Sequence, residues 1–204
     1  MSPGPADPQG YEIVERRPAY QGFFRLDVVR LRHRRFDGEW SQVITRELFA
    51  MRRAATVLPW DPVSDRVVLV EQFRTGAIDI CERPWMLEAC AGLAEGSEPA
   101  EDIARRECFE ESGLMPRRLA WACDYASSPG ATTEKVSVYV GEVTAPASGG
   151  IYGKAEEGED IRTHVLPFAE ALAMVGDGRI IAITAVVSLF WLQANHARLR
   201  EAWS

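Results

Sequence analysis

Two stretches rich in β-branched and aromatic residues stand near the start of the chain, at residues 24–31 and 43–49. The dipeptide Asp37-Gly38 between them suits a tight turn. This pattern predicts a small antiparallel sheet, which we assign to an N-terminal β-sheet subdomain of residues 1–53. The apolar face of such a sheet is too large for a few strands to leave exposed, so we expect it to pack on the rest of the chain or on a second subunit.

A mixed pattern of strands and helices follows in residues 54–204. Apolar runs at 56–58 and 67–70 flank a turn-forming sequence and predict a second hairpin. Further predicted elements are strands at 136–140 and 161–166, a helix at 168–175 that stops at Gly176, and a long helix at 184–203. Because strands and helices do not alternate regularly, the pattern favours an α+β or layered α/β/α fold over a doubly wound sheet.

Composition narrows the class of protein. The chain has 204 residues, 47% of them hydrophobic, which is enough to bury a full core. No run approaches the ~20 apolar residues of a membrane helix, so we expect a cytoplasmic protein without a membrane partner. The net charge of -7 argues against a nucleic-acid partner but allows a basic pocket for one phosphorylated small molecule. The cysteines form no CxxC pair, which favours reduced thiols over a zinc site.

The most informative segment, residues 92–114, reads as a loop that leads into a helix. Ser97 is placed to cap this helix, and Pro99 suits its first turn. Gly113 suits its end, because glycine readily adopts the left-handed conformation of a helix C-cap. These signals predict one short helix that ends before Gly113.

Three glutamates share one face of this helix, because positions three and four apart are neighbours: Glu107, Glu110 and Glu111. Like charges at these spacings destabilise a helix. Arg106 lies four residues before Glu110 and offsets its charge, whereas we expect Glu107 and Glu111 to lack a comparable local partner. A hard divalent cation, Mg²⁺ or Mn²⁺, is the natural neutraliser of such an all-oxygen set. For the glutamates alone, a solvated charged face is the simpler interpretation.

The spacing of the wider pattern decides between these interpretations. Fixed residue types recur at Gly92, Glu98, Arg106, Glu107, Glu110, Glu111, Gly113 and Leu114. This spacing resembles the Nudix box, and chance rarely matches eight spaced positions. Cys108, at an apolar position of the pattern, is a mild departure that concerns packing. The chain is thus identified as a member of the Nudix hydrolase family.

The resemblance implies an α/β/α sandwich with a mixed sheet, in which the box glutamates hold two or three metal ions against a diphosphate. By position, Glu107 and Glu111 resemble direct metal ligands, and Glu110 resembles a residue that supports them in catalysis or shares a metal. The backbone carbonyl of Ala91 resembles a further ligand. Structural roles, orienting the helix and its loop, fall to the remaining box positions Gly92, Glu98, Arg106 and Gly113.

Two segments beyond the box resemble the bacterial ADP-ribose pyrophosphatase subgroup. Pro129 stands fifteen residues after Leu114, a spacing found in that subgroup, although an ordinary Pro-Gly turn also explains it. In the acidic loop that follows, Glu157 resembles the catalytic base and Glu159 a further metal ligand. An acidic surface loop is the alternative, but hydrolysis requires a carboxylate that can reach the attacking water.

The N-terminal sheet completes the resemblance, which covers residues 11–203. In the subgroup this sheet is exchanged across a homodimer and helps to form the adenosine pocket. Aromatic faces stack on bases and arginines fork onto phosphates, so we assign substrate binding to Phe23, Phe24, Arg46, Arg74 and Glu134, together with Pro129. Phenylalanines on strands are otherwise ordinary core residues.

The implied activity is Mg²⁺-dependent hydrolysis of the pyrophosphate bond of ADP-ribose, to AMP and ribose 5-phosphate. Water would attack one phosphorus directly, with Glu157 deprotonating or orienting it. One alternative is a related pyrophosphatase for another nucleotide sugar, GDP-mannose or an ADP-sugar, because the box would serve any of them. Another is a sensor that binds ADP-ribose without catalysis, although a sensor has no need of the full glutamate set.

Overall fold

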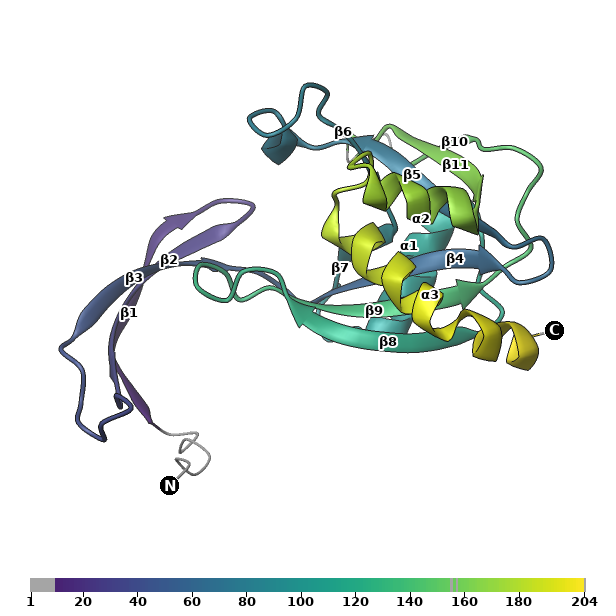
Figure 1. Cartoon of the computed structure of the whole chain (residues 1–204). Coiled ribbons are helices and arrows are strands. Elements are labelled where there is room, and N and C mark those ends of the chain that lie inside the picture. Colours follow the sequence, from purple (N-terminus) through teal and green to yellow (C-terminus); the bar gives the residue numbers. More distant parts are fainter. Residues whose placement is uncertain (1–9, 155, 157, 204) are drawn as a thin grey trace. The chain divides into compact units, whose positions relative to one another are not determined.

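The structure is a computed structural model that describes residues 10–154, 156 and 158–203 (Figure 1). It divides into two compact units. The first unit holds the residues up to 52 together with 126–134, and the second holds 53–125 and the residues from 135 onward. We refer to them as the first unit and the second unit and describe each by itself.

The first unit is a three-stranded antiparallel sheet. Its strands, in their order across the sheet, are β1 (Tyr11–Gln21), β2 (Arg25–His33) and β3 (Ile44–Ala50). The two predicted strands correspond to β2 and β3, and Gly38 in the loop between them has the positive φ, 87°, that the predicted turn requires. The hydrophobic pattern gave no signal for β1, because all 11 of its residues are exposed.

Residues 126–134 belong to this unit because they bond to β3. The backbone N–H of Phe49 donates to the carbonyl of Ala131 at 2.8 Å, and that of Thr133 donates to the carbonyl of Phe49 at 3.0 Å. The side chain of Thr133 also bonds both backbone groups of Met51, at 2.8 and 3.1 Å. A segment distant in sequence is thus tied to the edge of the three-stranded sheet.

The second unit is built on a larger sheet with the strand order β10-β11-β5-β4-β9-β8, in which β6 also pairs with β5 and β7 with β4. β4 runs parallel to β9 but antiparallel to β5 and β7, so the sheet is mixed. Its strands are β4 (Ala54–Asp61), β5 (Arg66–Phe73), β6 (Trp85–Glu88), β7 (Cys90–Leu93), β8 (Leu119–Ala126), β9 (Lys135–Glu142), β10 (Ile151–Tyr152) and β11 (Ile161–Pro167). The helical segments are η1 (Thr75–Ala77), α1 (Ala100–Ser112), α2 (Phe168–Gly176) and α3 (Ile183–Trp203).

Alternation along the central strands creates the layers of the second unit. On β4, Val57 joins a buried cluster with Ile103 of α1, whereas the next residue, Leu58, joins a second cluster with Leu189 of α3. Figure 1 shows α1, α2 and α3 beside the sheet of the second unit. α1 therefore covers one face and α2 with α3 the other, which confirms the predicted α/β/α arrangement with a mixed sheet.

The helix that carries the glutamates begins differently from the prediction. α1 starts at Ala100, directly after Pro99, and no side chain in the described part of the chain caps it. Ser97 instead lies in a turn with Gly96, whose φ is 61°, so the predicted Ser97 cap is wrong. The predicted end is confirmed, because Gly113 is the C-cap with a left-handed φ of 71°.

The C-terminal end of α3 is held by one arginine. Arg118 donates to the carbonyls of Ala202 at 2.8 Å and Trp203 at 2.7 Å, and its guanidinium forks onto the buried carboxylate of Glu142. These bonds satisfy carbonyls that a helix end leaves without partners. They also fasten α3 to the strands beneath it.

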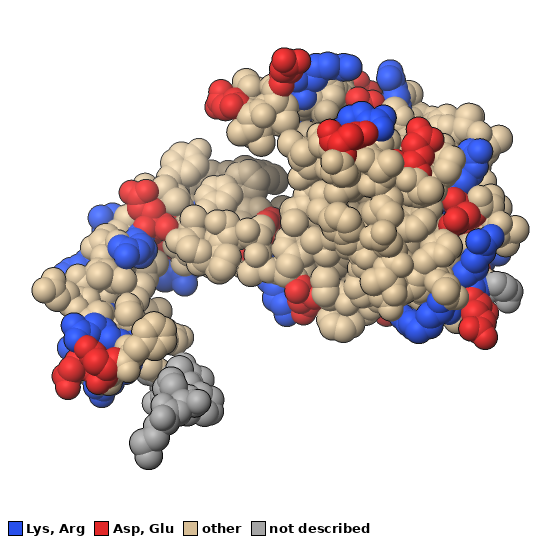
Figure 2. Space-filling model, viewed as in Figure 1, with Lys and Arg blue, Asp and Glu red and all other residues tan. Residues whose placement is uncertain are grey.

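The surface carries both signs of charge. On the face shown in Figure 2, Lys and Arg are interspersed with Asp and Glu, and neither sign dominates. None of the helices in the described ranges is long and apolar enough to cross a membrane.

Candidate active site

Glu111 lies at the centre of the candidate site, where α1 meets the sheet. Its side chain is buried, with the residue only 3% exposed. One carboxyl oxygen accepts the backbone N–H of Ala91 on β7 at 2.9 Å, and the other accepts the amide of Gln72 on β5 at 3.2 Å. This carboxyl group therefore fastens the helix to two strands.

Burial also sets the ionisation of Glu111. Desolvation raises the pKa of its carboxyl to about 8, and the nearby charge of Glu107 acts in the same direction. The bonds from Ala91 and Gln72 and the charge of Arg74 lower the pKa in part. In the absence of a cation, burial therefore favours the protonated form of this acid.

Glu107 occupies the space that a glycine leaves open. A Cβ on residue 92 would overlap the carboxyl group of Glu107, so strand β7 accommodates the acid only because residue 92 is Gly. Burial is the main cause that raises the pKa of Glu107, and the charges of Glu110 and Glu159 add to it. Gly92 thus leaves the space in which the carboxyl group of Glu107 lies, and its role in the site stays a prediction.

Arg106 is the hub of the charged network on α1. It donates to Glu98 through two nitrogens at 3.1 and 3.0 Å, and to the carbonyl of Leu93 at 3.1 Å. Its remaining nitrogen donates to Glu107 at 2.7 Å and to Glu110 at 3.2 Å. The expectation that Glu107 lacks a local partner is therefore wrong, because the long Arg106 side chain reaches the neighbouring acid while it holds the loop.

Lys154 adds a cation that the sequence did not indicate. Its ammonium group lies 3.0 Å from Glu110, and its backbone N–H donates to Glu159 at 3.0 Å. The charge of Glu159 in turn raises the pKa of Glu107 and that of Arg74. The segment before β11 therefore brings Glu159 near the glutamates of α1, whereas Glu157, the predicted base, lies outside the described residues.

Arg74 has an internal partner. Its guanidinium forks onto the carboxylate of Glu88 on β6, with distances of 3.0 Å and 2.6 Å. Glu88 is buried, and nothing in its sequence neighbourhood marked it as part of the site. The pairing of β5 with β6 brings the two residues together, so the predicted substrate arginine is held in place by an acid that the sequence analysis missed.

The comparison with known proteins decides the family. Residues 50–182 match the family model described as NUDIX domain. The chain belongs to the Nudix family. Among its Nudix relatives, the ADP-ribose pyrophosphatase of Escherichia coli (strain K12) is 46% identical over 193 residues, covering 95% of this chain and 92% of the relative. The ADP-ribose pyrophosphatase of Haemophilus influenzae is 39% identical over 198 residues, covering 96% and 91%.

More distant Nudix relatives carry other names. The GDP-mannose pyrophosphatase of Escherichia coli (strain K12 / DH10B) is 31% identical over 193 residues, covering 92% of this chain and 97% of the relative. A crystal structure of an ADP compounds hydrolase has a TM-score of 0.72 at 20% identity, covering 94% of this chain and 97% of that one, which shows the fold. The resemblance of this sequence to Nudix hydrolases and to the ADP-ribose pyrophosphatase subgroup is thereby confirmed.

The remaining predicted residues lie in the first unit, apart in sequence from the Nudix box. The ring of Phe23 is 83% exposed and meets Phe24 edge-on, with ring centroids 4.8 Å apart. The exposed side chain of Arg46 donates to the carbonyl of Thr45 at 2.8 Å. Pro129 lies exposed in a turn, and Glu134 accepts a hydrogen bond from Ser127. Their role in substrate binding stays a prediction.

The chemistry of the Nudix carboxylates fits a divalent cation. Within the described residues, no three His, Cys, Asp or Glu side chains converge into a finished metal site. The donor set is nevertheless all oxygen, and burial raises the pKa of both Glu107 and Glu111, so each carboxylate lacks full compensation for its charge. A hard cation such as Mg²⁺ would supply that compensation in competition with Arg106 and Lys154.

Proposed function

We propose that this Nudix hydrolase cleaves the pyrophosphate bond of ADP-ribose, giving AMP and ribose 5-phosphate. The observation that carries the proposal is the carboxylate face of α1, with Glu111 buried, in a chain 46% identical to an ADP-ribose pyrophosphatase over 95% of its length. We further propose that the protein acts in the cytoplasm without a nucleic-acid or membrane partner. Its net charge of -7 supports this, because long polyanions would be repelled.

The proposed metal ligands are the box glutamates and one residue of the acidic loop. Glu107 and Glu111 would hold Mg²⁺ or Mn²⁺, two or three ions in all, with help from Glu110, Glu159 and the carbonyl of Ala91. The metal would neutralise the diphosphate and lower the pKa of water. The raised pKa of Glu111 supports this assignment, since a buried acid without a strong cationic partner is a costly arrangement unless it has a ligand.

Positioning of the substrate would fall to the other predicted residues. We propose that Arg74 and Arg46 bind the phosphates and that Glu134 and Pro129 shape the ribose end. Glu157 would orient or deprotonate the attacking water. The fork between Arg74 and Glu88 supports the first of these assignments, because it holds one side of the guanidinium and fixes its direction.

We also propose a homodimer that exchanges the N-terminal strands. Large apolar side chains stand exposed on β1 and in the turn after it, among them Tyr20 at 65% and Phe23 at 83%. A second copy would cover such a surface. Size-exclusion chromatography with light scattering should give twice the mass of the chain, and a monomer at micromolar concentration would contradict both the dimer and the adenosine pocket.

The deciding experiment is Mg²⁺-dependent hydrolysis of a substrate panel, with AMP release followed by chromatography. We expect preference for ADP-ribose over GDP-mannose, ADP-glucose and NADH. Glu111→Gln should reduce the rate by a factor on the order of 10² to 10³, because it removes an electrostatic element of the reaction. Glu101→Gln is the matched control, since Glu101 is exposed on the same helix and pairs with Arg105 at 3.1 Å.

A second candidate is GDP-mannose cleavage, favoured by the relative that is 31% identical. The same panel separates the two. If GDP-mannose were hydrolysed and ADP-ribose untouched, the substrate proposal would be wrong while the metal site would stand. If Glu111→Gln kept the activity of the Glu101→Gln control, the metal site would be wrong instead.

A further inference from the structure

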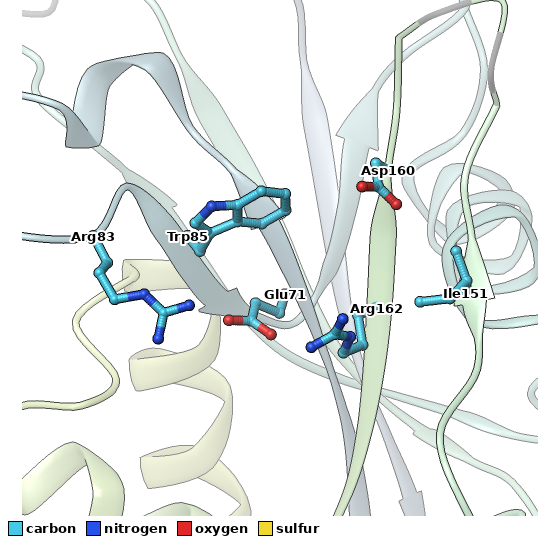
Figure 3. Close-up of a pocket in the computed structure, with 6 residues that line it drawn as sticks. All are labelled: Glu71, Arg83, Trp85, Ile151, Asp160 and Arg162. Atoms are coloured by element: carbon cyan, nitrogen blue, oxygen red, sulfur yellow. The ribbon is translucent and has the colours of Figure 1, made fainter.

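A cavity lies in the second unit, between β5, β6 and β11 (Figure 3). Its volume is about 280 Å³, close to the lower end of the ~300–1,000 Å³ common for ligand pockets. Its lining consists of Glu71, Arg83, Trp85, Ile151, Asp160 and Arg162. A single mononucleotide suits this volume better than a dinucleotide does.

This cavity faces away from the Nudix box. Glu71 is two residues after Leu69 on β5, and Leu69 packs in the core on the side of α2 and α3. The next residue, Gln72, points the other way and bonds Glu111. Because successive residues of a strand face opposite sides of the sheet, the cavity and the carboxylate site lie on opposite faces.

Two arginine side chains line the cavity without an acidic partner among the described residues. Among the described residues, the side chains of Arg83 and Arg162 have no hydrogen-bond or ion-pair partner. In Figure 3 their guanidinium groups turn toward Glu71 from either side. Glu71 is held by His164, 2.8 Å away. Paired guanidinium groups with open donors are suited to a phosphate.

The other lining residues suit a nucleoside. Trp85 is 40% exposed and Ile151 63% exposed, so an apolar ring face and an aliphatic side chain stand open to solvent at the cavity. Asp160, like the two arginines, has no hydrogen-bond partner within the described ranges. A free carboxylate beside an aromatic ring can accept hydrogen bonds from ribose hydroxyls while the ring stacks on a base.

We propose that this cavity binds a nucleoside monophosphate, with the phosphate on Arg83 and Arg162, the base on Trp85 and the ribose hydroxyls near Asp160. The inference comes from the lining chemistry and does not rest on the substrate of the Nudix site. Asp160 directly follows Glu159, so a ligand in the cavity would contact the segment that carries this proposed metal ligand.

The test follows the indole N–H of Trp85 in a two-dimensional nitrogen–proton NMR spectrum of the full chain. Trp85→Phe identifies the resonance among the 6 tryptophans. Added AMP should shift this resonance in a saturable way. Adenosine and inorganic phosphate each carry only half of the recognised groups, so each should need at least about tenfold higher concentration than AMP to saturate its binding. The double variant Arg83→Gln/Arg162→Gln should weaken AMP binding by at least about tenfold.

Two controls separate this site from the Nudix site. Arg117→Gln removes an exposed arginine elsewhere in the second unit and should leave AMP binding unchanged. Glu111→Gln should also leave the Trp85 shift intact, whatever it does to hydrolysis. The proposal is wrong if AMP leaves the Trp85 resonance unmoved, if the double arginine variant binds AMP as the wild type does, if phosphate alone binds as well as AMP, or if Glu111→Gln abolishes the shift.

Discussion

One guanidinium, that of Arg106, resolves much of the repulsion on the box helix. It bonds Glu98, Glu107 and Glu110 together, so three carboxylates share one cation. Glu111 stands outside this arrangement, because its partners are the neutral donors of Ala91 and Gln72. Glu111, which has no cationic hydrogen-bond partner, is also the most deeply buried of the four box glutamates, and a divalent cation would have most effect there.

At the residue scale, Gly92→Ala tests whether the position of the Glu107 carboxyl group depends on the missing side chain of residue 92 on β7. The added methyl group would displace the flexible end of Glu107 and leave the backbone in place. We expect hydrolysis to fall about 100-fold, because small misplacements of catalytic groups are costly, with little change in melting temperature. Gly76→Ala is the control, since a Cβ there meets open space. Equal activity of the two variants would contradict the role of Gly92.

The raised pKa of Glu111 predicts how the metal-free protein responds to pH. The folded state holds the proton up to a pKa of about 8, whereas the unfolded chain releases it near the ordinary pKa of 4.5. Protonated Glu111 therefore contributes fully to the stability of the folded state below about pH 4.5. This contribution is lost as the pH rises from there through about 8, and the free energy of unfolding falls by at most ~1.4 kcal/mol per pH unit. Urea unfolding with a chelator should show this slope, and Glu111→Gln should flatten it. An unchanged slope in the variant would contradict the assignment.

The sequence indicated the box residues but not all their partners. The eight spaced positions predicted which glutamates gather on α1, because helix geometry fixes that from sequence alone. The contact of Lys154 with Glu110 and the fork of Arg74 with Glu88 escaped prediction. Both depend on which strands pair, and that is set by the packing of the whole sheet.

Among the elements, α3 depends on its last turn, where Arg118 bonds two carbonyls and Glu142. We expect Arg118→Met to lower the free energy of unfolding more than a matched exposed arginine variant does, because charged hydrogen bonds to a buried acid and a helix end are lost. The bond from Arg118 also lowers the pKa of Glu142. The stabilisation of the folded state by the ion pair of Arg118 and Glu142 is present above the ordinary pKa of the acid and is lost as the pH falls below it.

Urea unfolding of Arg118→Met at about pH 7 and about pH 4 measures both effects, with the larger loss at the higher pH. Arg117→Met is the matched control. Arg117 is exposed and its side chain bonds Thr144 at 3.0 Å, so its loss should change stability by less than about 0.5 kcal/mol. Equal losses in the two variants would show that the bonds of Arg118 to α3 do not stabilise the fold.

Long elements that bury several apolar residues were predicted, whereas β1, β8 and the shortest strands were not. Several apolar residues are buried on each of six elements, and the sequence analysis placed all six: β4, β5, β9, β11, α2 and α3. β1 lacks such a face, because its 11 residues are exposed. β6, β7 and β10 are at most four residues long, too short for a period to show. The start of α1 was misplaced because a serine before a proline resembles a cap whether or not it acts as one.

At the scale of the whole molecule, the chain passes between its two units three times, at 52/53, 125/126 and 134/135. The last two passages let residues 126–134 join β3, and Thr133 makes two of the bonds that hold them there. Thr133→Val should speed hydrogen exchange at the amide of Met51 about fivefold to tenfold, the loss expected for one or two hydrogen bonds. Thr133→Ser keeps the hydroxyl and should exchange as the wild type does. Unchanged exchange in Thr133→Val would mean that other contacts hold this segment.

The bonds between β3 and residues 126–134 also bear on how this protein can be recombined with its relatives. A chimaera that took residues 1–52 from another protein would leave Ala131 and Thr133 facing a foreign Phe49 and Met51. Residues 49 and 51 take part only through their backbone groups, so these bonds would tolerate new side chains there, but the register would have to match to the residue. The N-terminal strands therefore cannot be transferred to another protein by themselves. Any graft that keeps them folded has to carry the nine residues of 126–134 along.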